Sequence, residues 1–435
     1  MRNKWCATSL PAMTTTASAP QPLRRNAEYR RWLLGDICLE LGTGIGTFAF
    51  PLVTYAVTGS LGATGLVGMI QGIGGLVGMV PGGLLADRFG RRRLRLLAGS
   101  TGTLLQAVLI VVLMAGWGSV LVLATIAFLD RFRAGLLGAA SDAMLKQLVP
   151  PTQLPRAVSV NQGRDAAVEM IAGPLGGVLF GLAVAFPPLA QLLGNLGSVL
   201  ATWRMRGRYL PRAVEAASTR VRDDLREAVV WALSQRVRVQ LLAVATLVNL
   251  GSNGLLLTVL LHLTASGVPA GRIGLLNTVL AGSILLGAVL APRLVEKVPT
   301  GVLVTGPILI MAAAAAFLPF APGMLAIAAA YAVMGIGIAP LNAGTQGFLL
   351  HITPVAMQGR IGALMGTIAM GFMPLAPAAA GWGLDLVGPL PTMLLFSGIL
   401  VAGALVVLLG RDLRRVPVAA RWESYARAEG LSSEG

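Results

Sequence analysis

Acidic and basic side chains occur inside three apolar segments of this chain, where a charge is costly unless it has a partner or a function. Asp36 and Glu40 lie four positions apart in the first segment, on one face of a helix that Thr43 and Thr47 continue. The other two segments hold Asp130, Arg131, Arg133 and Asp142, and Arg164, Asp165 and Glu169. A desolvated carboxylate can gain and lose a proton near neutral pH, so these residues are suited to proton transfer.

We expect the carboxylates to differ in their roles. Asp130 is followed by Arg131 and lies near Arg133, so we expect it to stay ionised as a structural partner. Glu40 and Glu169 have no such basic neighbour in the sequence, and one of them is expected to exchange a proton for a substrate while Arg131 tunes its affinity. The alternative is a set of static ion pairs that hold the three helices together. The candidate residues for proton coupling and the substrate cavity are Asp36, Glu40, Asp130, Arg131, Asp165 and Glu169.

The chain that positions these groups is more apolar than a soluble domain. Of its 435 residues, 55% are hydrophobic and 12% are charged, and apolar runs long enough to cross a bilayer recur along it. A helix satisfies its own backbone hydrogen bonds in lipid, so we expect an all-α polytopic membrane protein with twelve transmembrane helices. The spans are predicted at 32–57, 64–86, 95–116, 119–148, 158–184, 188–205, 239–264, 271–294, 300–319, 323–349, 359–386 and 389–410.

The basic residues are distributed so that they predict a topology. The net charge is +16, and Arg and Lys gather before the first span, after the last one and in every second loop, whereas the remaining loops hold almost none. By the positive-inside rule, both termini are cytoplasmic and the protein is multi-pass in the inner (plasma) membrane. We therefore expect the lipid bilayer, and no nucleic acid, to be the partner of the basic surface.

Two halves of the chain resemble each other. LLADRF at 84–89 corresponds to VLAPRL at 289–294, and nearly the same separation places Gly177 over Gly381. Such matches indicate a duplicated six-helix unit, an arrangement in which transporters place their site between the halves. The predicted domains are a disordered tail at 1–25, six-helix bundles at 26–205 and 239–410, a cytoplasmic linker at 206–238 and a cytoplasmic tail at 411–435.

The linker is the longest polar stretch of the chain. Its apolar residues Val221, Leu225, Val229 and Leu233 recur at helical spacing, with charges between them. The pattern predicts an amphipathic helix from Thr219 to Arg238 that lies on the cytoplasmic surface.

A charged motif, GLLADRFGRR at 83–92, follows the second predicted span. It resembles the signature that the major facilitator superfamily carries in its cytoplasmic loop between helices 2 and 3. The resemblance implies the major facilitator fold and transport by alternating access. It also implies that Asp87 and the arginines after it hold the cytoplasmic helix ends together in the outward-facing state. The implied gating residues are Gly83, Asp87, Arg88, Gly90, Arg91 and Arg92.

Two further stretches resemble antiporter motifs of the same superfamily. LDRFRAGLLGAA has Arg131 and Gly135 at the positions of the helix 4 motif. On helical spacing, Arg131, Gly135, Gly138 and Asp142 form one stripe, where the small residues are expected to leave room for solvent or ligand. GPLGGVL at 173–179 resembles the helix 5 motif, one residue shorter, and RAVSVNQ at 156–162 is similar to the branch of macrolide-efflux and enterobactin exporters. The helix 5 motif residues are Gly173, Pro174, Gly176 and Gly177.

Residues and resemblance together predict a proton-coupled exporter of a lipophilic drug-like or secondary-metabolite molecule. We expect it to use the proton gradient without a cofactor, to bind a small-molecule substrate and to act as a monomer. The alternatives are a siderophore exporter or a lysophospholipid transporter on the same scaffold, or a non-transporting membrane protein that serves as a sensor or assembly partner. The sequence shows no residues spaced for metal binding and no phosphate loop, so we expect neither an enzyme nor direct use of ATP.

Overall fold

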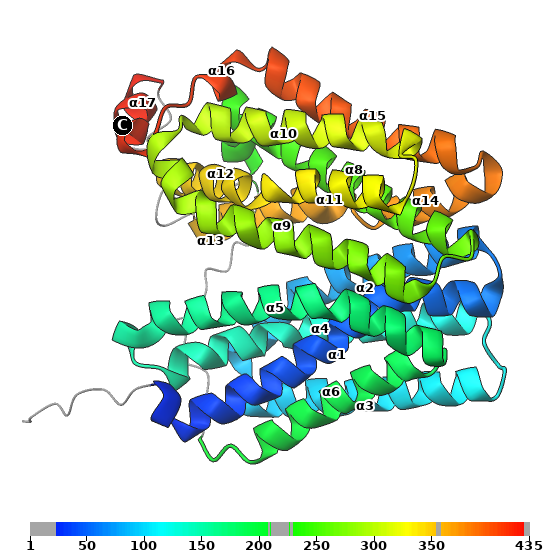
Figure 1. Ribbon diagram of the computed structural model, residues 1–435. Helices are drawn as coiled ribbons and strands as arrows, with labels where there is room; N and C mark the ends of the chain where they lie inside the picture. Colours follow the sequence, from blue (N-terminus) through cyan, green and yellow to red (C-terminus); the bar gives the residue numbers. More distant parts are fainter. Residues whose placement is uncertain (1–22, 208, 210–225, 227–228, 354–357, 430–435) are drawn as a thin grey trace, which may run out of the picture.

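The computed structural model describes residues 23–207, 209, 226, 229–353 and 358–429. Within these ranges the chain is helical, with no strand. The helices form two bundles, the N-terminal one below and the C-terminal one above in Figure 1. The predicted all-α class is confirmed.

The first bundle consists of six long helices. Side chains of Asn26, Ser60 and Ser119 accept a hydrogen bond from the first turn of the helix that follows each of them, which satisfies a backbone amide at its start. A short 3-10 turn, η2 (Pro151–Gln153), precedes the fifth helix. The helices are α1 (Ala27–Thr58), α2 (Leu61–Arg88), α3 (Arg91–Met114), α4 (Val120–Leu148), α5 (Leu154–Leu182) and α6 (Phe186–Trp203).

In the second bundle, two predicted spans are interrupted. The span at 323–349 divides at Gly337, because Pro340 has no amide to donate to the Ile336 carbonyl. The span at 359–386 divides before Pro374 in the same way. The helices are α8 (Arg236–Ala265), α9 (Ala270–Lys297), α10 (Thr300–Phe317), α11 (Met324–Ile336), α12 (Ile338–Ile352), α13 (Gln358–Gly371), α14 (Leu375–Leu386) and α15 (Pro389–Leu409).

In the described ranges the helices form twelve long segments, with α11–α12 and α13–α14 counted as one segment each. Ten candidate spans in the described ranges are long and apolar enough to cross a membrane. The other two segments, α4 and α6, carry polar residues such as Asp130, Gln191 and Asn195, which are buried inside the bundle. Leu104 and Leu121 are more than half exposed on the outside, as a lipid-facing surface requires. The chain is a multi-pass membrane protein.

The predicted linker helix does not run unbroken to Arg238. Val221 and Leu225 lie outside the described residues, but the chain is helical at 229–233, bends at Ser234 and resumes as α8. The bend lets the guanidinium of Arg238 lie 3.8 Å from the centre of the Trp231 ring and donate to Ser234 Oγ at 3.1 Å. Arg238 is therefore buried by contacts with Trp231 and Ser234, whereas the helical pattern of the linker predicts it on the charged, exposed face.

The described part of the predicted C-terminal tail is folded against the second bundle. It contains α16 (Arg411–Arg414), η4 (Ala419–Arg421) and α17 (Trp422–Ala428). Trp422 donates from Nε1 to Thr300 Oγ1 at 2.9 Å, and its ring packs edge-on against Phe348 with 5.8 Å between centroids. The tail thus binds where α10 begins and α12 ends.

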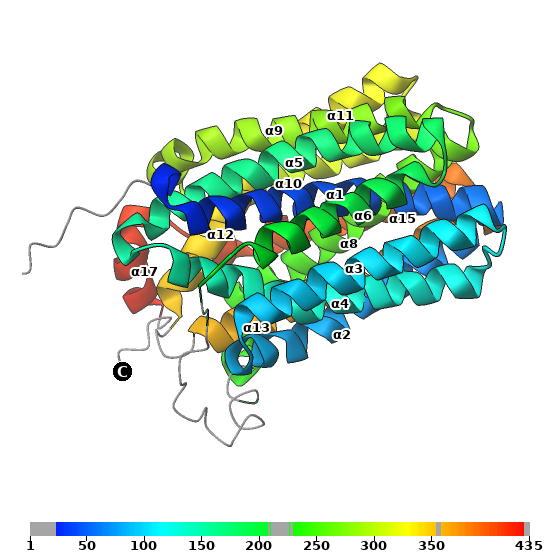
Figure 2. The same cartoon turned by 90° about the horizontal axis from the view of Figure 1, so that it is seen from below.

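The two ends of the molecule differ. We call the end that carries the chain termini the basic end, since Arg91, Arg156, Arg293 and Arg411 lie there. The bundles meet at the opposite end and diverge toward the basic end (Figure 1), and α5 runs beside α9 in the view from below (Figure 2). We call that opposite end the apolar end, after its loops at 59–60, 115–119, 183–185, 266–269, 321–323 and 387–388.

Candidate functional site

Two helix pairs join the bundles at the apolar end, and glycines bring each pair close together. A Cβ on Gly177 in α5 would lie 2.3 Å from the carbonyl oxygen of Ala270 in α9. A Cβ on Gly381 in α14 would lie 2.3 Å from the carbonyl oxygen of Leu61 in α2. Such short distances leave no room for a larger residue. Gly177 and Gly381, which the sequence repeat pairs, therefore make equivalent contacts in the two halves.

The helix 5 motif builds one of these contacts. A Cβ on Gly173 would lie 2.8 Å from Cβ of Asn277 in α9, and Pro174 lies against Gly274 of the same helix. Gly176 faces α1 instead, where a Cβ would meet the Phe48 ring at 3.0 Å. The motif therefore packs α5 against both α1 and the other bundle.

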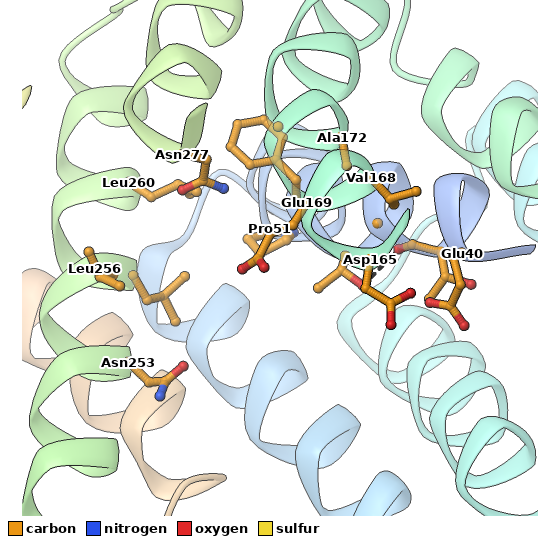
Figure 3. Close-up of a pocket in the computed structure, with 16 residues that line it drawn as sticks. Glu40, Pro51, Asp165, Val168, Glu169, Ala172, Asn253, Leu256, Leu260 and Asn277 are labelled. Carbon is orange, nitrogen blue, oxygen red and sulfur yellow. Dashed lines mark hydrogen bonds between the residues drawn. The ribbon is translucent and has the colours of Figure 1, made fainter. Parts of the chain in front are cut away.

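A cavity of about 530 Å³ lies between the bundles next to this contact (Figure 3). The first bundle contributes three carboxylates, Glu40 from α1 and Asp165 and Glu169 from α5, which extend into the same space. Amides and apolar side chains of the second bundle face them. The second-bundle residues are Asn253, Leu256, Leu257, Leu260 and Asn277.

Glu169 stands out among the three carboxylates. Among the residues that the structure describes, its carboxylate has no hydrogen-bond or ion-pair partner, whereas Asp165 accepts from Arg164 at 2.7 Å.

The space beside α4 and α5 continues toward the basic end. A Cβ on Gly163 or Gly138 would meet no atom within 4 Å, so both helices face open space there. Over the same described ranges, no three His, Cys, Asp or Glu side chains come together to hold a metal ion.

Asp36 lies outside this cavity, although it shares a helix with Glu40. Its Oδ1 lies 3.0 Å from Arg95 Nη1 and accepts from Ser141 Oγ at 2.8 Å, and its Oδ2 is paired with Arg164. Asp36 is 5% exposed and Arg95 is 3% exposed. The carboxylate thereby links α1 to α3, α4 and α5, which is the static arrangement that the sequence left open.

Arg95 is the residue that the sequence did not single out. Its position next to Arg91–Arg93 groups it with the basic loop, but it lies one turn inside α3. It donates to Thr202 Oγ1 at 3.1 Å and to the Trp32 carbonyl oxygen at 3.1 Å, as well as binding Asp36. Unlike those three arginines, it falls between Leu94 and Leu96, where the apolar run begins, and this is the signal that could have identified it.

Asp130 and Arg133 form a second buried ion pair, with 2.8 Å between Arg133 Nη2 and Asp130 Oδ1. Arg133 also donates to the Ala98 carbonyl oxygen at 2.7 Å, and Gln191 donates to Asp130 at 3.3 Å. These contacts tie α4 to α3 and α6.

Arg131 points to the other side, where it donates to Thr47 Oγ1 of α1. Thr47 lines the main cavity and also a small pocket of about 10 Å³ beside Asp130, Arg131 and Gln191. That volume is about the size of one water molecule. Arg131 is thus connected to the cavity through one hydroxyl.

The expectation that small residues on this face of α4 leave room for solvent or ligand agrees with the open space at Gly138 but is wrong for Gly135. A Cβ on Gly135 would lie 2.6 Å from the Gly75 carbonyl oxygen, so this residue brings α4 against α2. The side chain of Asp142, which the sequence places on the same stripe, lies outside what the structure describes.

The arginines of the loop motif bind carbonyl groups of their own bundle. Arg91 Nη1 donates to the Ala143 carbonyl oxygen at 2.7 Å, and Arg92 Nη2 donates to the Trp203 carbonyl oxygen at 2.8 Å. Cations are favourable at helix C-termini, where α4 and α6 end. Gly83 and Arg88 are exposed and Gly90 precedes α3, but the Asp87 side chain is outside the described set, so its gating role stays a prediction.

Tyr209 anchors the start of the linker to the same surface. Its hydroxyl donates to Glu28 Oε2 at 2.8 Å, and its carbonyl oxygen accepts from the Arg91 amide at 3.0 Å. Burial and then this hydrogen bond to a carboxylate raise the pKa of Tyr209 above its usual value, because both disfavour the phenolate.

Comparison with known proteins agrees with this geometry. The model of the Major Facilitator Superfamily matches residues 33–238, which include the first bundle from Leu33 onward. No curated protein matches the chain.

Solved structures of transporters share the arrangement over nearly the whole chain. A point mutant of the nucleoside transporter NupG is 13% identical, with a TM-score of 0.72 over 89% of this chain and 100% of its own. A bacterial homolog of the human lysosomal transporter Spinster, inward-facing and unoccupied, is 14% identical, with a TM-score of 0.67 over 91% and 98%. An inward-facing bacterial homologue of the iron transporter ferroportin is 19% identical, with a TM-score of 0.65 over 93% and 100%. The chain has the major facilitator fold.

Proposed function

We propose that the chain is a proton-coupled secondary transporter that exports an amphipathic small molecule by alternating access. The observation that carries this proposal is the set of carboxylates Glu40, Asp165 and Glu169 in a cavity between two bundles that meet at the apolar end. The positive-inside rule favours the basic end as cytoplasmic, so the cavity would face the cytoplasm of the plasma membrane in this state.

Glu169 is the proposed proton carrier. Its carboxylate extends into the cavity and has no partner among the described side chains, so no ion pair there competes with the binding of a proton or a substrate. A substrate that enters from the cytoplasm and interacts with the carboxylate favours the ionised form, and the proton leaves to the cytoplasm. After the cavity opens to the other side and the substrate departs, Glu169 takes up a proton from outside. The proton gradient thereby drives export.

Arg131 is proposed to adjust this equilibrium. It reaches the cavity wall through Thr47 and is held near Asp130 on its other side. Its positive charge beside the cavity would act on how readily the carboxylates exchange a proton for the substrate.

The alternatives from the sequence are less well supported. Three carboxylates in one cavity oppose binding of an anionic siderophore, since like charges repel. A purely structural role suits Asp36 and Asp130, which are paired in buried sites, but not Glu169. No feature of the cavity favours a lysophospholipid over other amphiphiles.

The proposal is tested by accumulation of the fluorescent lipophilic cation ethidium in cells. Cells with the wild-type protein should accumulate several-fold less dye than cells without it, and a protonophore should abolish the difference. Glu169→Gln should behave like no transporter, and Glu296→Gln, an exposed site at the basic end of α9, should behave like wild type. Export that persists with the protonophore would overturn the proton coupling.

A further inference from the structure

A second cavity, of about 450 Å³, lies in the C-terminal bundle between α8, α12 and α13. Among the described residues that line it there is no Asp, Glu, Lys, Arg or His. Its polar groups are amides and hydroxyls set among Leu, Ile and Met side chains. They are Asn249, Asn342, Thr345, Gln346, Thr353 and Gln358.

One polar atom in this wall lacks a partner. Thr345 Oγ1 is buried and has no hydrogen bond to any described residue. Buried hydroxyls are almost always hydrogen-bonded, so this atom can bind a partner that the described residues do not supply. Among the described residues, Asn249 Nδ2 makes one contact, a long one of 3.5 Å with the Ala369 carbonyl oxygen, so it too can donate to a ligand.

The groove beside these groups is kept open by Gly362 and Gly366, which lie one turn apart on α13. A Cβ on either residue would meet no atom within 4 Å. Both glycines line the second cavity, so a ligand can approach the α13 backbone closely there.

The two cavities adjoin along α8. Asn253 lines the carboxylate cavity and Asn249 lines the second one, and Asn253 Nδ2 donates to the Asn249 carbonyl oxygen at 2.9 Å. Four residues of helix rise about 6 Å, so a ligand only slightly longer than one helical turn reaches both.

We propose that the second cavity is a separate subsite for the uncharged, hydrogen-bonding part of the substrate. The substrate class is then an elongated amphiphile with a cation at one end and a neutral body that bears carbonyl or hydroxyl groups. Its cation lies by Glu169, and its body lies against Asn342, Thr345 and Gln346. This inference rests on the proposed function, because it takes the carboxylate cavity as the site of the charged end.

The side chains that line the two cavities suit different parts of the substrate, the carboxylates a cation and the amides and hydroxyls a neutral polar body. Amides and hydroxyls both donate and accept, so they satisfy a neutral polar body without requiring an ion. A charged group placed against them would lose its hydration without gaining a counter-charge. A site built to hydrogen-bond its ligand discriminates against analogues that lack the polar group, because its own polar atoms are then left unpaired.

The test uses two cationic probes with the purified full-length protein. Rhodamine 6G is a cation with an ester and two secondary amines, and tetraphenylphosphonium is a cation without hydrogen-bonding groups. Binding of rhodamine 6G is measured by fluorescence polarisation, and tetraphenylphosphonium by competition. The variant N342L/T345V removes polar atoms from the second cavity, whereas Thr305→Val, on α10 and outside both cavities, is the matched control.

N342L/T345V should weaken rhodamine 6G binding about tenfold, the loss expected from one to two hydrogen bonds, and change tetraphenylphosphonium binding less than about twofold. Glu169→Gln should weaken both probes. Equal effects of N342L/T345V on both probes, no effect on either, or failure of the wild type to bind rhodamine 6G would overturn the subsite. A failure of the proposed function, rather than of the subsite, would appear as substrate-dependent proton transport that Glu169→Gln leaves unchanged.

Discussion

The carboxylate of Asp385 in α14 accepts a hydrogen bond of 2.7 Å from the backbone amide of Gly62 at the start of α2. Ser60 Oγ donates to the same oxygen at 3.2 Å. A side chain of one bundle therefore caps a helix of the other, and the partial positive charge of the α2 N-terminus strengthens the contact. This latch lies at the apolar end, so it must break before that end can open.

Asp385→Asn should shift the protein toward a state that is open at the apolar end. A neutral amide binds the helix start more weakly by about 1.5 kcal/mol, which corresponds to about a tenfold change in the equilibrium. Spin labels on cysteines at Met114 and Leu386, both about 80% exposed, report the distance between the bundles in a background without Cys6 and Cys38. A longer distance should gain population, and Glu296→Gln is the control. An unchanged distribution would contradict the latch.

Gly177→Val should prevent the apolar end from closing, because its Cβ would lie 2.3 Å from the Ala270 carbonyl oxygen. Gly181→Val, one turn further along the same helix, meets no atom within 4 Å and serves as the matched control. A cysteine at Leu257, in the cavity wall, should then react several-fold faster with a membrane-impermeant maleimide added on the side of the apolar end. Equal rates in both glycine variants would count against the close contact.

Much of the fold can be predicted from the sequence because lipid restricts the options. Apolar runs of sufficient length must be helices, so the spans follow from composition, and the repeat anticipates the equivalent contacts of Gly177 and Gly381. Some prolines break a span, as Pro340 does at Gly337, whereas others, such as Pro174, lie inside an unbroken helix. Composition alone does not show which of the two occurs.

The candidate site was predictable only in part. Helical spacing shows which residues share one face of a helix, but it does not show which residues of other helices that face contacts. Glu40 and Asp165 do line one cavity, but Asp36 turns toward Arg95, which the sequence places at the first position of a predicted span, beside the arginines of the loop motif. The contact between Asp385 and Gly62 joins positions far apart in the chain. It depends on how the bundles dock, which no local pattern encodes.

Asp36→Asn should destabilise the first bundle strongly. Without the carboxylate, the buried guanidinium group of Arg95 loses its counter-charge, which typically costs about 3–5 kcal/mol, and Arg164 loses one of its two acidic partners. Asp165→Asn also removes a partner of Arg164, but that carboxylate is 55% exposed, so its loss should cost less than about 1 kcal/mol. Thermal unfolding in detergent measures both. Similar melting temperatures for the two variants would show that Asp36 is not the structural hub.

Trp422→Ala should release the C-terminal tail from the second bundle. The change removes the ring packed on Phe348 and the hydrogen bond to Thr300. Amide hydrogen exchange in α17 should become at least roughly tenfold faster, because local opening then costs less free energy. Glu423→Gln, which breaks only the exposed ion pair with Arg427, should leave the exchange rates unchanged. Slow exchange that persists in Trp422→Ala would mean that other contacts hold the tail.

Proton flux coupled to substrate tests the central claim most directly. In proteoliposomes with an imposed pH gradient, addition of ethidium on the side from which it is pumped should dissipate the gradient for wild type and for Glu296→Gln. Glu169→Gln should bind the dye more weakly and produce no dye-dependent proton flux, because the proposed carrier cannot ionise. Dye-dependent proton flux of wild-type size in Glu169→Gln would contradict the assignment of Glu169 as the proton carrier.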